Sequence, residues 1–383
     1  MEKPKIRFLK NKHSWVRNTF EEIAKRRTKS SDNPDLPRIE YQDIISGEGR
    51  LNKDLNKNID SRKGIFFETN DILYGKLRPY LKNWLHPNFN GIALGDFWVL
   101  QARNCDSKFL FSLVQSPKFQ RVANDTSGTK MPRSDWKTVS QTEFSIPTSN
   151  EEQSAIGSLF CTLDDLLASY KDNLANYQSL KATMLSKMFP KAGQTVPEIR
   201  LDGFEDGWEE KEFSKLVKRV TQSSDSNSLP KVEFEDIISG QGRLNKDISN
   251  KFDNRKGIHF EPGYTLYGKL RPYLNNWLLP KFEGVALGDF WVFDPNGNDS
   301  NFIYYLIQSN RYQKVANDTS GTKMPRSDWK SVSSTIFAIP QTVAEQQAIG
   351  AYFSNLDNLI AAHQEKISQL EILKKKLLQD MFI

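Results

Sequence analysis

The chain has 383 residues, and its 38% hydrophobic and 26% charged content excludes a disordered or fibrous protein and suits two globular domains. No run approaches the ~20 apolar residues of a membrane span, and the polar opening MEKPKIRFLKNK lacks the apolar core of a signal peptide, so we expect a cytoplasmic protein. A net charge of +6 permits a polyanionic partner without requiring one.

The first ~147 residues predict a mixed α/β globule. Short β-type runs, such as GIFFE at 64–68 and DFWVL at 96–100, alternate with turns rich in Gly, Pro and Asn. A helical pattern, FLFSLVQS, follows at 109–116. We therefore expect an α+β fold for this part of the chain.

A long helix is expected next, because about 40 residues without proline follow Ile146 and Pro147. Ser149 precedes Glu152 by three residues, which is the spacing of a capping box, and Thr342 and Glu345 repeat it. Apolar residues then recur in alternating steps of four and three, a coiled-coil pattern. The residues expected to pair the two helices are Ile156, Phe160, Leu163, Leu167, Leu174, Ile349, Phe353, Leu356, Ile360 and Ile367.

Two arrangements of these helices are open. Each helix could simply cover its own globule. Alternatively, the two could pair with each other as a coiled coil, and their length favours this, since ~40 residues make a rod of about 60 Å, longer than a globule of ~150 residues is wide. Lys181 and Lys374 interrupt the apolar pattern at equivalent places and could set the register.

The second half of the chain repeats the first at a constant offset. The segment VANDTSGTKMPRSDWK at 122–137 recurs unchanged at 315–330, and YGKLRPYL at 74–81 recurs at 267–274. A period this long excludes a solenoid. We predict a first globule at 1–147, a first helix at 148–190, a second globule at 191–340 and a second helix at 341–383.

The repeat also tests for catalytic groups, because chemistry performed by both halves needs its reactive residues in both. No histidine or cysteine passes this test: the counterparts of Cys105 and Cys161 are Asn298 and Ser354, and the histidines at 13, 86, 259 and 363 are all replaced. Two cysteines also make no disulfide framework. We expect no catalytic residue, no metal site and no bound cofactor on this chain.

The repeated segments instead combine cations, hydroxyls and aromatic rings in turn-like settings, which suits DNA phosphates and base edges. We expect Phe97, Trp98 and Trp136 to belong to the core instead. The candidate DNA-binding residues are Lys76, Arg78, Tyr80, Lys82, Thr126, Ser127, Thr129, Lys130 and Arg133 in the first half, and Lys269, Arg271, Tyr273, Thr319, Ser320, Thr322, Lys323 and Arg326 in the second.

The order of motifs carries a family resemblance. A globule with LYGKLRPYL, GDFWV and SGTxMP, then EQxAI and a long helix with LDxL, twice over, resembles the specificity subunit of type I restriction-modification systems. One departure is the segment KNKHSW from Lys10 to Trp15, which lacks the sequence DGFEDGW found at 202–208 of the second copy, and this leaves the edge strand or loop of the first globule open.

The resemblance implies two target recognition domains that each read half of a split DNA site, separated by two antiparallel helices with pseudo-twofold symmetry. It also implies two methyltransferase subunits docked on the helices, and restriction subunits. S-adenosylmethionine, ATP and Mg²⁺ would then belong to these partners.

Because the two halves are nearly the same, we expect an interrupted, near-palindromic DNA target with a spacer of one to two helical turns. The alternatives are a duplicated scaffold or ligand-binding protein with two equivalent sites, and an orphan subunit that acts as a decoy.

Overall fold

The computed structural model describes residues 4–8, 14–52, 61–125, 130–251, 254–318 and 323–382. The chain forms two compact units, one made of residues 1–172 and 364–383 and the other of residues 173–363. Each unit therefore contains one globule, the first part of that globule's own long helix, and the last part of the other long helix. The division falls within the helices.

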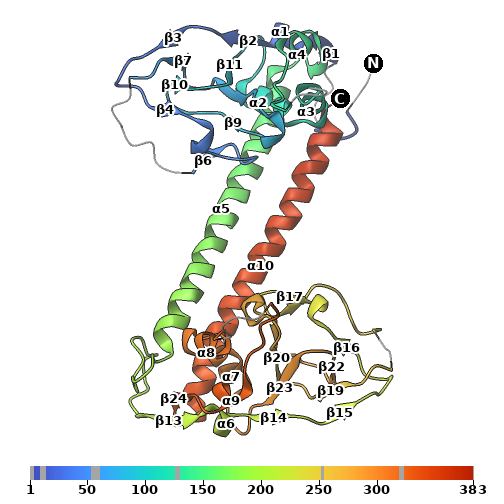
Figure 1. Ribbon diagram of the computed structural model, residues 1–383. Coiled ribbons are helices and arrows are strands. Elements are labelled where there is room, and N and C mark those ends of the chain that lie inside the picture. The colour runs from blue at the N-terminus through green and yellow to red at the C-terminus, as the bar shows by residue number, and fades with distance from the viewer. Residues whose placement is uncertain are drawn as a thin grey trace. The chain divides into compact units, whose positions relative to one another are not determined.

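The first unit is built on two four-stranded sheets and two two-stranded ribbons, one of which is β5-β6 (Figure 1). One sheet has the order β2-β11-β8-β9 and the other β3-β7-β10-β4, while β1 pairs with β12. Strand β11 is central, because its residues 97–100 are buried and pair with β8 in the register Trp98↔Tyr74. The strands are β1 (Trp15–Thr19), β2 (Ala24–Arg27), β3 (Ser30–Ser31), β4 (Arg38–Ile39), β5 (Ile44–Ile45), β6 (Arg50–Leu51), β7 (Gly64–Phe67), β8 (Ile72–Gly75), β9 (Trp84–Leu85), β10 (Gly91–Ala93), β11 (Phe97–Ala102) and β12 (Glu143–Pro147).

Helices α2, α3 and α4 pack on this framework, and the side chains of Asp106, Ser116 and Asp135 cap their first turns. The Asp106 carboxylate accepts the Phe109 amide at 2.9 Å, and Asp135 does the same for Thr138 at 2.7 Å. The helical elements are α1 (Phe20–Ile23), η1 (Tyr41–Asp43), η2 (Pro79–Leu81), α2 (Ser107–Gln115), α3 (Pro117–Ala123), α4 (Trp136–Gln141) and α5 (Asn150–Met188).

The second unit repeats these elements, as the duplicated sequence requires. Its sheets have the orders β14-β23-β20-β21 and β15-β19-β22-β16, and β13 pairs with β24. The elements are β13 (Trp208–Glu212), α6 (Phe213–Leu216), β14 (Lys218–Val220), β15 (Ser223–Ser224), β16 (Lys231–Val232), η3 (Phe234–Asp236), β17 (Ile237–Ile238), β18 (Arg243–Leu244), β19 (Gly257–Phe260), β20 (Thr265–Gly268), η4 (Pro272–Leu274), β21 (Trp277–Leu278), β22 (Gly284–Ala286), β23 (Phe290–Asp294), α7 (Ser300–Leu306), α8 (Asn310–Ala316), α9 (Trp329–Ser333), β24 (Ile336–Pro340) and α10 (Val343–Met381).

The mixed α/β fold class with two long helices is confirmed. Phe97 and Trp98 lie in the core, and Trp136 packs against it half-buried, as expected from the sequence. The sequence left the edge strand of the first globule near Lys10 undetermined. The structure shows strand β1 from Trp15 onward, paired with β12 in the register Trp15↔Pro147. Residues 9–13 lie outside the described part of the chain.

The capping-box prediction was only half right. Ser149 does accept the backbone amide of Glu152 at 3.3 Å. The buried Glu152 carboxylate, however, binds the guanidinium of Arg7 at 2.6 and 2.7 Å and the indole N–H of Trp15 at 3.2 Å. Glu345, Arg200 and Trp208 repeat this arrangement in the second unit. The glutamate therefore ties the start of the long helix to the beginning of its own globule.

The residues expected to pair the helices show both arrangements that the sequence left open, since they contact the globule and the other long helix. Ile156, Phe160, Leu163 and Leu167 are buried in one cluster, and this cluster also holds globule residues such as Phe109 and, from α10, Leu370, Leu378 and Met381. Ile349, Phe353 and Leu356 are buried likewise in the second unit. Leu174, Ile360 and Ile367 are only half-buried, so their pairing role stays a prediction.

The two lysines that interrupt the apolar pattern of the long helices form ion pairs. In the first unit Lys374 of α10 lies 2.5 Å from Asp164 of α5, and Lys171 lies 2.8 Å from Glu371. In the second unit Lys181 of α5 lies 2.7 Å from Asp357 of α10. In the first unit, partners that come later in α5 pair with residues that come earlier in α10, so the two helical segments run antiparallel. These ion pairs fix the register of the helices within each unit.

Candidate nucleic-acid interface

A strained turn displays several of the predicted DNA-binding residues. The turn η2 is flanked by Arg78, with φ 47°, and Lys82, with φ 55°. Both residues are left-handed without being glycine, which costs on the order of 1–3 kcal/mol each and persists only where the surroundings enforce it. The buried ring of Pro79 and the bond from the Gly47 amide to the Lys82 carbonyl, at 3.0 Å, hold this shape.

The second predicted group lies directly beside this turn. Leu77 and Arg133 form an isolated β-bridge. The Arg78 amide donates to the Pro132 carbonyl at 2.7 Å, and the Ser134 amide donates to the Lys76 carbonyl at 2.8 Å. The structure thus brings together residues that the sequence separates by more than 50 positions.

An aspartate that sequence reasoning missed organises the same place. The Asp96 carboxylate lies 3.5 Å from the Lys76 ammonium and 3.1 Å from the Arg133 guanidinium. Its backbone carbonyl accepts the Lys76 amide and, at 2.6 Å, the Tyr41 hydroxyl. Lys76 and Arg133 are therefore partly neutralised within the protein, which makes them positioning groups before they are contacts to an anion.

Tyr41 adds a difference between the units. Burial raises the pKa of its phenol to about 12, so the hydroxyl stays neutral, donates to Asp96 and accepts the Leu77 amide at 3.2 Å. Phe234 stands at the equivalent position of the second unit and packs edge-on against Phe290, as Tyr41 does against Phe97. The hydroxyl is thus specific to the first unit.

The second unit otherwise reproduces the geometry. Leu270 bridges Arg326, the Arg271 amide donates to the Pro325 carbonyl at 2.7 Å, and Arg271 is left-handed with φ 48°. Asp289 lies 3.6 Å from Lys269 and 3.1 Å from Arg326. Two independently folded copies of one turn make this geometry a property of the repeated sequence.

Around each turn, apolar and cationic side chains face solvent together. Tyr80 is 56% exposed and Tyr273 is 58% exposed, which is unusual for a ring of this size. Arg78 and Lys130 are exposed and have no ion pair among the residues that the structure describes. We call these surfaces the turn patches: Arg78, Tyr80, Leu81, Lys130 and Met131 in the first unit, and Arg271, Tyr273, Leu274, Lys323 and Met324 in the second.

The remaining predicted residues fall elsewhere. Thr126, Ser127, Thr129, Thr319, Ser320 and Thr322 lie outside the described residues. Lys82 stands at the far end of the turn from Arg78 and lines a cavity that is described below.

Reactive side chains are poorly placed for chemistry. Burial raises the pKa of the Cys105 thiol to about 12 and also raises that of Cys161, which disfavours the thiolate. Burial lowers the pKa of His86, whose ring stacks on Phe111. Over the described ranges, no group of His, Cys, Asp and Glu residues could hold a metal ion.

Comparison with known proteins finds a family model and several relatives that are similar to the chain. Residues 215–372 match the family model described as a type I restriction modification DNA specificity domain. The segment at 22–179 is the counterpart of that match in the first repeat. The second repeat thus contains a match to this specificity domain, and the first repeat carries the equivalent residues. Among the described residues, no helix has the length and apolar character needed to cross a membrane.

Two curated specificity subunits are similar to the chain. That of the type I restriction enzyme EcoDI of Escherichia coli is 26% identical over 47% of the chain and 42% of its own length. That of MjaVIII of Methanocaldococcus jannaschii is 22% identical over 83% of the chain and 79% of its own length. The chain thus aligns with less than half of the first relative and about four fifths of the second.

Solved structures agree on the fold. The crystal structure of a type I S subunit from M. genitalium covers 100% of the chain with a TM-score of 0.65 at 14% identity. A chain from a study of complex assembly in a type I system covers 96% with a TM-score of 0.51 at 17% identity.

Proposed function

We propose that this chain is the specificity subunit of a type I restriction-modification complex, that it is the DNA-reading component, and that each unit reads one half of a bipartite target. The observation that carries the proposal is the turn patch, which occurs twice with the same backbone geometry. Each patch offers a guanidinium without an ion pair among the described residues, an exposed aromatic ring and an exposed lysine, which are groups that hold phosphates and base edges.

The two halves of the target are proposed to be nearly the same sequence in inverted order, because the two units present nearly the same residues. Differences such as Tyr41 against Phe234 and Lys82 against Asn275 allow one half-site to differ by a base. The base pairs between the two half-sites would be unspecified.

The chain is proposed to have no catalytic role of its own. Two methyltransferase subunits would dock on the long helices and bind S-adenosylmethionine, and restriction subunits would bind ATP and Mg²⁺. The assembly would act on DNA in the cytoplasm. Exposed leucines on both long helices, for example Leu166 and Leu359, are available for such docking.

A salt titration of DNA binding separates this function from a two-site scaffold or ligand-binding protein. A protein that holds phosphates releases counterions, so the logarithm of its affinity falls steeply and linearly with the logarithm of the salt concentration. We expect such a slope for the isolated chain on duplex DNA. A flat response, or no DNA binding, would favour the scaffold. A decoy subunit would bind DNA alike but would support no methylation when the methyltransferase subunits are added.

A further inference from the structure

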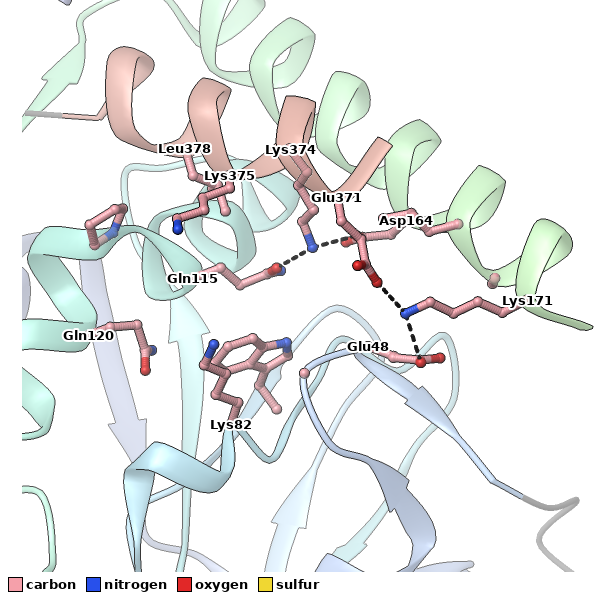
Figure 2. Close-up of a pocket in the computed structure, with 15 residues that line it drawn as sticks. Glu48, Lys82, Gln115, Gln120, Asp164, Lys171, Glu371, Lys374, Lys375 and Leu378 are labelled. Atoms are coloured by element: carbon pink, nitrogen blue, oxygen red, sulfur yellow. Dashed lines mark hydrogen bonds and ion pairs between the residues drawn. The ribbon is translucent and has the colours of Figure 1, made fainter. Parts of the chain in front are cut away.

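A cavity of about 370 Å³ lies within the first unit, where the globule meets α5 and α10 (Figure 2). Its walls come from the loop at Gly47 and Glu48, from the end of the turn at Lys82, and from the junction of α2 and α3 at Gln115 and Pro117. Ligand pockets for small molecules begin at about this size. No residue that lines the cavity belongs to the turn patch.

Most charges around the cavity satisfy one another. Lys374 binds Asp164 at 2.5 Å and donates to Gln115 at 2.7 Å. Lys171 lies 3.1 Å from Glu48 and 2.8 Å from Glu371. Burial opposes ionisation of Glu48, yet the hydrogen bonds from Arg50 and Lys171 outweigh it and lower the pKa of this carboxyl. These groups form a fixed, charged frame.

The groups left over are all donors. Lys82 and Lys375 line the cavity without an ion pair among the residues that the structure describes. Figure 2 shows them reaching the same space from the turn and from α10. The buried indole N–H of Trp84, which also lines the cavity, has no acceptor there either. Both lysines are exposed, and together with the buried N–H that lacks an acceptor they give this part of the cavity donors suited to an anion.

We propose that this cavity binds a small organic anion, with a flat apolar body and one phosphate or carboxylate group. The anionic group would lie between Lys82 and Lys375. The body would pack against the apolar part of the lining, which consists of Trp84, Pro117, Leu167, Ala168 and Leu378. This inference stands independently of the proposed DNA-reading function.

The second repeat lacks the charges that this ligand needs. Asn275 and Ala182 replace Lys82 and Lys375, while Gln241, Gln364 and Gln178 replace Glu48, Lys171 and Glu371. The indole of Trp277 shares the unpaired N–H of Trp84, so the lysines make the difference. Only the first unit is therefore expected to bind the anion.

Titration calorimetry of the full chain without DNA tests the proposal with three probes: adenosine 5′-monophosphate, benzoate and inorganic phosphate. We expect one site per chain for at least one of the two organic anions, tighter than for inorganic phosphate. The better organic probe identifies phosphate or carboxylate as the preferred group. Lys375→Ala and Lys82→Asn should each weaken binding at least about tenfold, the size expected for a charged hydrogen bond.

These two substitutions install the residues of the second repeat, so the variants should fold, and thermal unfolding checks this. Lys376→Ala removes the same charge from the neighbouring position of α10, which is equally exposed but does not line the cavity, and should leave binding unchanged. No binding of either organic probe, equal binding of inorganic phosphate, or unchanged affinity in both folded variants would each overturn the proposal.

Discussion

Replacing Arg78 and Arg271 together by alanine is expected to weaken DNA binding about 100-fold. Each arginine stands at the start of a turn whose backbone is held in place, so the backbone needs no further ordering when the guanidinium contacts DNA. Each lost contact costs on the order of 1–3 kcal/mol, and 1.4 kcal/mol corresponds to a factor of ten. Fluorescence anisotropy with a cognate and a scrambled duplex, over a range of salt concentrations, measures the effect.

The pattern of loss distinguishes the two roles of these arginines. An equal loss on both duplexes, with a salt slope reduced by about one for each arginine, indicates phosphate contacts. A loss confined to the cognate duplex indicates base contacts. Lys25→Ala with Lys218→Ala removes the same charge from equivalent exposed positions of β2 and β14 and should have a much smaller effect. Unchanged affinity in the folded Arg78/Arg271 variant would remove the turn patches from the interface.

Leu163→Asp and Leu356→Asp should each destabilise their unit by several kcal/mol. Both leucines are 6% exposed and lie in clusters shared by the globule and the long helices. The change removes a buried apolar side chain, at a cost of about 2–5 kcal/mol, and leaves an unpaired carboxylate in its place. Urea unfolding followed by circular dichroism measures the loss.

The helices supply a matched control three residues further on. Leu166 and Leu359 are 42% and 41% exposed, so the same change to aspartate there should alter the free energy of unfolding by less than about 1 kcal/mol. If Leu163→Asp unfolds at the same urea concentration as Leu166→Asp, the packing described for the helix is wrong.

The duplication, the long helices and the core aromatics could be predicted from the sequence, because repeats and apolar periodicity are local properties. The partners of the charged residues could not. Glu152 binds Arg7 across 145 positions, and Lys374 binds Asp164 across 210, and nothing in the spacing of these residues signals such pairs.

The sequence predicted which residue types make up the candidate interface, but not the backbone conformation of the turn that presents them. Proline fixes only its own φ, so Pro79 gave no sign that Arg78 and Lys82 on either side are left-handed. Asp96 was overlooked because the surrounding GDFWV pattern indicates core, and Phe97 and Trp98 do lie there. A short acidic residue next to a repeated core motif, near repeated cations, was the available signal.

The central claim, that two equivalent units read a split DNA site, is tested most directly by sequencing methylated adenines in DNA from cells that carry this subunit with its methyltransferase partners. We predict methylation within an interrupted near-palindrome, with two short specified blocks of nearly the same sequence in inverted order around an unspecified spacer. Two unrelated blocks, or one compact uninterrupted site, would contradict this account.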